Sequence, residues 1–280
     1  MYLCIMKNNL LFSIILISSI FLLSSCSKFS KIQKSENVEL KLKAAIEYYE
    51  AGDYYKSGVL LDEILPLVRG RAEAEKANFY LAYTHFKQKE YIMSTYYFKD
   101  FYLTYPRSEF TEEAVFMYAK SLYMDSPQYN LDQTNTESSV KYLQEYANRY
   151  ANGKYIEEST KMLDELSAKM KVKSYENSKL YFKTHNYKSS VVAIKSFIEM
   201  YPDSEFTEEM YFIRFESQYL LSKHSVTFKQ MERYYEAIEF YHNFVDKYPN
   251  SKYLKDAEGI YEICRQKIDN NTSSKNLINK

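Results

Sequence analysis

The 280-residue sequence has no tryptophan, and glycine and proline occur only five times each. So few turn-forming residues argue against a many-stranded β fold and favour long helices. The three cysteines, Cys4, Cys26 and Cys264, are too few and too scattered for a disulfide framework, and none has zinc-site spacing. The 37 basic and 37 acidic residues balance, so the chain lacks the positive excess typical of nucleic-acid binding. We therefore expect no nucleic-acid partner.

Motifs for catalysis are also missing. The four histidines, His85, His185, His224 and His242, are dispersed along the chain and belong to no metal-binding motif. Glycine is too scarce to build a phosphate-binding loop. The sequence therefore predicts a protein that is not an enzyme, with no metal site and no bound cofactor. What it has instead is aromatic residues, 31 Tyr and 17 Phe, which supply large apolar groups for a core and hydroxyls for partners.

The N-terminus contains an apolar run, Leu10 to Leu23, preceded by Lys7. The run is shorter than the roughly 20 residues that span a bilayer, and it fits the core of a signal peptide. The pattern "MKNNLL" favours translation from Met6 over Met1. We predict a signal peptide over residues 1–25.

The run ends in Leu23-Ser24-Ser25-Cys26, which resembles a bacterial lipobox. The resemblance implies cleavage before Cys26 and a covalent lipid on this residue, which would then begin a lipidated tether over 26–35. Several acyl chains give stable anchoring where one does not. The alternative is an ordinary signal peptide followed by a chance cysteine. With Cys26 lipidated, Cys264 is left as the free thiol, and its apolar surroundings predict a small core residue.

One spacing recurs through the chain. From Tyr91 to Pro106 it reads Y-x2-S-x3-F-x2-F-x4-P, and copies precede Pro202 and Pro249. An early copy has Arg69 in place of proline, and a degenerate copy ends at Tyr150-Ala151. Steps of three and four place these residues on one helix face, the small residue allows close approach, and proline ends the helix.

Each of these helices follows another helical stretch through a tight turn, for example Gly52-Asp53, Lys89-Glu90 or His185-Asn186. This arrangement is the tetratricopeptide (TPR) signature. We predict an all-α, TPR-like helix-hairpin solenoid of about five repeats plus a capping helix near 253–268; the alternative is an unrelated helical bundle. The predicted boundaries are N-terminal repeats 1–3 over 36–150, C-terminal repeats 4–5 and the cap over 151–269, and a disordered tail over 270–280.

Three segments depart from the regular repeat. We expect polar loops at Asp125–Asn135 and at Lys223–Glu232, and one long helix over 154–183. The phrase "YPRSEFTEE" at Tyr105 returns as "YPDSEFTEE" at Tyr201. Its serine is expected to cap the next helix, and its glutamates to suit the helix dipole.

The whole pattern resembles the BamD family of outer-membrane assembly lipoproteins. The resemblance rests on the lipobox, on "AGDYYKSG" at Ala51, "YLAYTHFKQKEY" at Tyr80 and "YPRSEF" at Tyr105, and on the interrupted third repeat. It implies a non-enzymatic scaffold of the β-barrel assembly machinery, lipid-anchored in the outer membrane and facing the periplasm. Its C-terminal repeats would hold the periplasmic domains of a BamA-like protein, and its N-terminal repeats would meet unfolded outer-membrane β-barrel proteins.

A TPR stack binds mainly through the first helix of each pair. We therefore predict an aromatic groove lined by Leu42, Ile46, Tyr49, Phe79, Tyr83, Phe86, Phe116, Lys120 and Tyr123. The alternative is that these rings only pack between helices. Lys195, Arg214, Arg233, Lys252 and Lys255 are candidate contacts for the partner, or else a solvated charged face.

Other envelope TPR lipoproteins remain an alternative. A glycan-binding surface lipoprotein is disfavoured by the absence of tryptophan. A coordinator of cell-wall synthesis would need a trimerisation segment, for which Ser27 to Val38 is too short.

Overall fold

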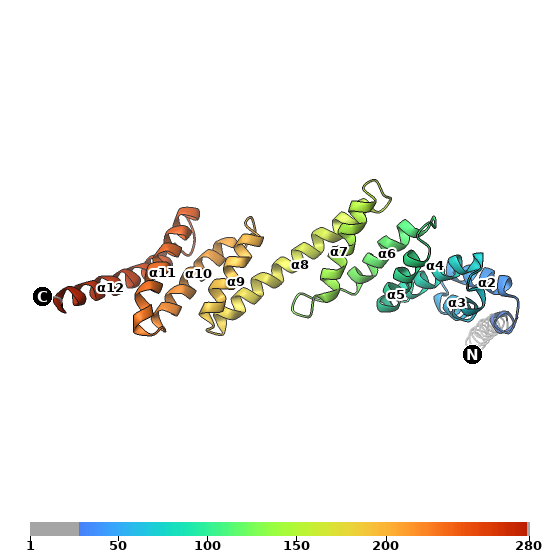
Figure 1. The fold of residues 1–280 in the computed structure, drawn as a ribbon, viewed down its shortest axis with the longest axis horizontal. Helices are drawn as coiled ribbons and strands as arrows, with labels where there is room; N and C mark the ends of the chain where they lie inside the picture. Colours follow the sequence, from blue (N-terminus) through green and yellow to red (C-terminus); the bar gives the residue numbers. More distant parts are fainter. Residues whose placement is uncertain (1–27, 279–280) are drawn as a thin grey trace, which may run out of the picture. The chain divides into compact units, whose positions relative to one another are not determined.

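The computed structural model describes residues 28–278, so the predicted signal peptide and Cys26 lie outside the described part. The described chain is helical (Figure 1). Its complete helices are α2 (Val38–Glu50), α3 (Tyr54–Val68), α4 (Ala72–Lys87), α5 (Tyr91–Thr104), α6 (Thr111–Met124), α7 (Thr134–Arg149), α8 (Ile156–Lys183), α9 (Tyr187–Met200), α10 (Thr207–Lys223), α11 (Thr227–Lys247) and α12 (Leu254–Ile278). Within this part, no helix is both apolar enough and long enough to cross a membrane.

The helices pair as the repeat spacing predicts. Five hairpins, α2–α3, α4–α5, α6–α7, α8–α9 and α10–α11, are followed by α12. We call the first member of each pair a first helix and the other a second helix. Gly52, Lys89 and His185 occupy the same place in three of the hairpin turns, and their φ angles of 81°, 63° and 59° lie in the left-handed region that reverses the chain. The predicted all-α, TPR-like fold is confirmed.

Small polar residues mark the crossings between second helices and the following first helices. Ser94 and Ser121 are fully buried, and their hydroxyl oxygens lie 2.9 Å apart. Ser190 and Ser217 repeat the contact at 2.8 Å. Each hydroxyl pair satisfies its own hydrogen bonding while it allows two helices to approach closely.

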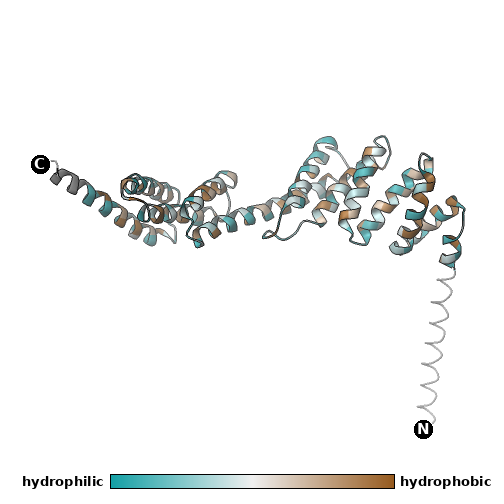
Figure 2. Ribbon diagram, turned by 60° about the horizontal axis from the view of Figure 1, so that its bottom comes forward, coloured by the Kyte–Doolittle hydropathy of each residue, from teal (hydrophilic) through white to brown (hydrophobic). Residues whose placement is uncertain are grey.

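The chain divides into two compact units: Met1–Pro127 with Leu131–Leu166, and Gln128–Asn130 with Ser167–Lys280. Apolar and polar residues alternate around the helices in both (Figure 2). The first unit has two clusters of buried residues, which are centred on Leu60–Leu61 and on Phe116. The second unit has one, which includes Phe215 and Cys264. Burial raises the pKa of the Cys264 thiol to about 12, which agrees with a core residue and opposes thiolate chemistry.

Three segments differ from the sequence expectations. Residues 28–33, expected to belong to a tether, are helical, and Phe29 packs edge-on against Tyr48 of α2 with ring centres 5.7 Å apart. The insertion at Lys223–Glu232 forms only a short loop, because α11 already begins at Thr227. The helix α12 continues to Ile278, beyond the end expected near Ile268. Residues 28–33, 223–232 and 269–278 contain no glycine or proline, so helix propagation adds a hydrogen bond per residue.

Two other expectations hold. A loop follows α6 and separates it from α7, as the interrupted third repeat predicts. The stretch after Gly153 forms α8, a single helix of 28 residues. The boundary between the compact units falls inside α8, whereas the predicted boundary at residue 150 marks the end of a repeat.

Candidate binding site

The aromatic residue at the end of each repeated turn stacks on a ring of the preceding first helix. The first helices supply one partner of each pair, and the turns that open the next first helix, or α12, supply the other. The four stacked pairs, with their ring-centre distances, are Phe79–Phe110 at 4.5 Å, Phe116–Tyr155 at 4.4 Å, Tyr175–Phe206 at 4.1 Å and Phe212–Tyr253 at 4.9 Å. Offset-stacked rings add to the burial of apolar area, so each pair fastens one hairpin to the next.

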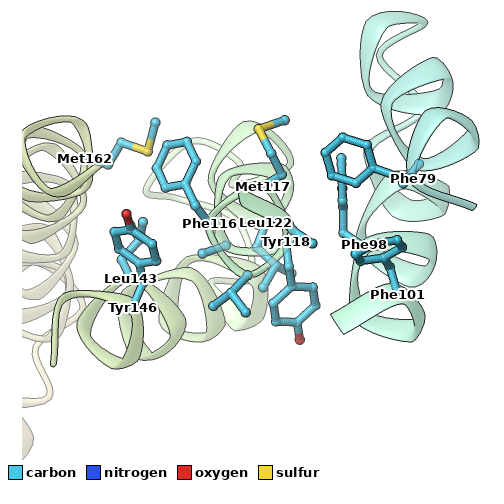
Figure 3. Packing of buried hydrophobic residues seen from close by; sticks show 14 of the residues in the cluster. Phe79, Phe98, Phe101, Phe116, Met117, Tyr118, Leu122, Leu143, Tyr146 and Met162 are labelled. Carbon is cyan, nitrogen blue, oxygen red and sulfur yellow. The ribbon is translucent and has the colours of Figure 1, made fainter. Parts of the chain in front are cut away.

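This stacking corrects two groove assignments. Phe79 and Phe116 were predicted to line the groove, but they are only 6% and 1% exposed. Phe79 lies beside Phe98 and Phe101, and Phe116 points toward Met162 of α8 (Figure 3). Their rings are used to pack successive hairpins, so they leave too little surface for a ligand.

Carboxylates tie successive first helices together. The Tyr83 hydroxyl of α4 donates a hydrogen bond to Glu113 of α6, and in the second unit the Tyr175 hydroxyl of α8 donates to Glu209 of α10 at 2.6 Å. Lys120 pairs with Glu158 of α8 at 2.7 Å. Glutamates of the first turn, expected from the sequence to suit the helix dipole, therefore also bind the neighbouring repeat.

The predicted groove residue Tyr123 is held in the same way. Its hydroxyl donates to Glu165 of α8, and this hydrogen bond, together with partial burial, raises the pKa of Tyr123 to about 12. Burial, followed by the hydrogen bond to Glu113, also raises the pKa of Tyr83. Both tyrosines remain neutral donors, and what they present to a ligand is mainly the ring.

The remaining groove residues form a partly exposed aromatic surface on the first unit. Tyr49 of α2 meets the edges of Tyr80 and Tyr83 of α4, with ring centres 5.2 Å and 6.2 Å away. The Lys120 ammonium lies 5.8 Å from the ring centre of Phe86. We call Tyr49, Tyr80, Tyr83, Phe86, Lys120 and Tyr123 the aromatic face.

Beside this face, Leu42 and Ile46 of α2 line an open hollow of about 460 Å³ together with Lys76 of α4. The hollow places these two predicted residues where α2 and α4 adjoin. Tyr80 was missed by the sequence argument, although its position three residues before Tyr83 is a helical spacing that indicates a shared face.

The five predicted partner contacts have different surroundings. The Lys195 side chain is exposed and lies 3.8 Å from Glu199, and Lys252 lies 4.9 Å from the ring centre of Tyr253. Lys255, near the start of α12, is exposed. Their separate environments place these three lysines at the surface of the second unit without defining a common site.

The two arginines are more enclosed. The Arg214 guanidinium lies 3.9 Å from the ring centre of Phe240, and its Nε is buried without a hydrogen-bond partner in the described part of the chain. Burial lowers the pKa of Arg214. Arg233 donates a hydrogen bond to the Ser225 hydroxyl and lines a cavity of about 920 Å³. Of the five predicted contacts, these two arginines are partly buried, whereas the three lysines are exposed.

The sequence has relatives among outer membrane lipoproteins. No curated protein matched the sequence. Among solved structures, a thermophilic TPR protein of Thermus thermophilus is 14% identical, with a TM-score of 0.32, and the match covers 82% of this chain and 100% of that one. A family model described as outer membrane lipoprotein, YfiO, matches residues 38–187 and 169–270, which extend over most of both compact units. The chain therefore belongs to the YfiO, or BamD, family of outer membrane lipoproteins.

Proposed function

We propose that this protein is a non-enzymatic scaffold of β-barrel assembly in the outer membrane. It would hold the periplasmic domains of a BamA-like protein and receive unfolded β-barrel precursors, with a covalent lipid on Cys26 as its anchor on the periplasmic side. The observation that carries the proposal is the family match, which extends over all five hairpins and the beginning of α12.

The aromatic face supports precursor binding by its chemistry. Its rings are partly exposed and lie on consecutive first helices, and the rings of Tyr83 and Tyr123 are fixed in place by the hydrogen bonds to Glu113 and Glu165. Rigid rings bind a segment at a lower entropic cost than flexible side chains do. An extended peptide that ends in an aromatic residue, as β-barrel proteins commonly do, would add its own ring to this surface.

Partner binding is assigned to the second unit. Arg214, whose guanidinium lies on the ring of Phe240 and whose side chain is partly exposed, is the predicted contact best placed to gain from a carboxylate of the partner. A charged group that is already partly desolvated loses less hydration when the interface closes.

Truncating the aromatic face should weaken precursor binding. We expect the double change Tyr49→Ala and Phe86→Ala to reduce the affinity for a C-terminal peptide of an outer-membrane β-barrel protein by about tenfold or more, because ring anchors dominate such interfaces. Both residues are only partly buried, so the fold should survive. Fluorescence anisotropy with a labelled peptide measures the effect.

The matched control is Tyr55→Ala, since Tyr55 is 70% exposed on the second helix α3. This variant should bind the peptide as the unmodified protein does. Unchanged affinity in the double variant, or equal loss in the control, would show that precursors do not use the aromatic face.

A further inference from the structure

The largest cavity described above lies at one end of two hairpins of the second unit. Residues His185 to Lys188, at the turn from α8 to α9, form one wall. The other wall comes from Leu221 to Arg233, at the turn from α10 to α11. The cavity is open to solvent and has a volume of about 920 Å³, in the size range of sites that hold a small ligand or a few side chains.

The insertion in the fifth repeat builds this second wall. The second helices α5 and α9 each have 14 residues, whereas α11 has 21. The additional length lies at the start of α11 and carries Phe228 and Lys229. The insertion in the fifth repeat therefore lengthens α11, and the added residues form part of the cavity wall.

The basic side chains in the cavity are not balanced by acidic ones. Lys188, Lys229 and Arg233 line it, and none of the lining residues is Asp or Glu. The first turns of α9 and α11 hold no acidic residue, whereas those of α6 and α10 hold two glutamates each. Grouped positive charge in a concavity attracts a negatively charged ligand and orients it.

An apolar surface accompanies the positive charge. Phe228 is 80% exposed and Val226 is 57% exposed, both on the cavity wall. Tyr187 of the first wall stacks on His224 of the second with ring centres 6.1 Å apart, and the Tyr187 hydroxyl lies 2.8 Å from Nδ1 of His185. Phe228 is thus an exposed ring that lines the same cavity as the packed rings of Tyr187 and His224. An exposed ring of this kind suits contact with an apolar group of a ligand.

We propose that this cavity binds an acidic protein segment that carries an aromatic or aliphatic side chain next to its carboxylates. The carboxylates would pair with Lys188, Lys229 and Arg233, and the apolar side chain would pack against Phe228. Charge complementarity selects the acidic segment, and the exposed rings select a segment with an apolar side chain over a purely acidic one. This inference does not rest on the proposed role in β-barrel assembly.

The test uses the purified full chain in detergent and a short fluorescent peptide of glutamates around a central phenylalanine. Charge reversal by Lys188→Glu with Lys229→Glu, and separately Phe228→Ala, should each weaken binding by about tenfold or more. Both lysines and Phe228 are exposed, so these variants should fold. Lys267→Gln and Tyr235→Ala change exposed residues away from the cavity and should leave binding unchanged.

Two further probes identify the occupant. A peptide with glutamines in place of glutamates should bind far more weakly, and equal binding of the two peptides would contradict the charge argument. Unchanged affinity in both the charge-reversed and the Phe228→Ala variants would overturn the assignment of the cavity. So would binding of anionic lipid vesicles, or self-association seen by sedimentation, that depends on these residues while the peptide fails to bind.

Discussion

Replacing Phe116 with alanine is expected to destabilise the first unit by about 3–5 kcal/mol. The ring is 1% exposed, stacks on Tyr155 at 4.4 Å, and lies 5.6 Å from the ring centre of Tyr146. It therefore joins α6 to α7 and to the turn that opens α8. Truncation would lose apolar burial, leave a cavity and remove the stacked pair, and the neighbouring helices can close the gap only in part.

Urea unfolding, with hydrogen exchange of peptides from each unit, measures and locates this loss. The control is Tyr96→Ala, because Tyr96 is 61% exposed on α5 and its truncation removes little packing. A loss of about 0.5 kcal/mol or less in Phe116→Ala, the usual range of a surface change, would mean that the stacked pairs do not fasten the hairpins.

The second large effect concerns the one turn that departs from the repeated phrase. The corresponding positions hold Ser108, Ser204 and Ser251 in three turns, and the preceding second helices carry Phe101, Phe197 and Phe244. In the remaining turn the serine is replaced by Gly153 and the phenylalanine by Tyr146.

The two replacements compensate for each other. In the regular turn the Ser108 hydroxyl accepts a hydrogen bond from the Phe110 backbone N–H at 3.0 Å. In the exceptional turn the Tyr146 hydroxyl accepts the equivalent bond from the Tyr155 N–H, also at 3.0 Å. It also donates to Glu112 at 2.9 Å. The tyrosine oxygen thus takes the place of the serine oxygen, and the glycine leaves room for it.

We expect Gly153→Ser to destabilise the first unit by about 1–3 kcal/mol, the usual cost of overpacking. A Cβ at this position would lie 2.6 Å from the Tyr146 hydroxyl oxygen and 2.7 Å from Glu112 Oε1, which is closer than van der Waals contact allows. Adding Tyr146→Phe restores the regular pair of residues and should recover part of the loss. A double-mutant cycle, with the free energy of unfolding measured in urea, gives the coupling between the two positions. Additive effects of the two changes would contradict the compensation between Gly153 and Tyr146.

Much of the fold follows from the spacing of residues. The recurrent small and large residues placed the five hairpins correctly, because steps of three and four fix a helix face whatever the surroundings. The three residues with positive φ in the hairpin turns, Gly52, Lys89 and His185, were also located, since they stand between two periodic stretches. The role of Ser108 needed refinement: it accepts from the N–H of Phe110 in the turn before α6, and it donates to Glu75 of α4 at 2.5 Å.

The site was harder to predict than the fold. A first helix of a TPR stack has two apolar surfaces, one packed against neighbouring hairpins and one turned to a ligand, and periodicity does not separate them. Phe79 and Phe116 were therefore assigned to the groove although they belong to the packing surface. The cavity beside Phe228 was missed because the insertion was interpreted as a polar loop. Its lack of glycine and proline was the signal that helix α11 would extend through it.

The central claim is tested most directly by recovering the tagged protein from outer membranes solubilised in mild detergent. The account predicts that a BamA-like β-barrel protein is recovered with it. It also predicts that Arg214→Ala reduces this recovery while the helical fold is retained. Lys267→Gln, an exposed change on α12, should leave the recovery unchanged. Recovery of cell-wall synthesis enzymes or surface glycan-binding proteins, with no BamA-like protein present, would contradict the assembly role and favour another envelope TPR lipoprotein.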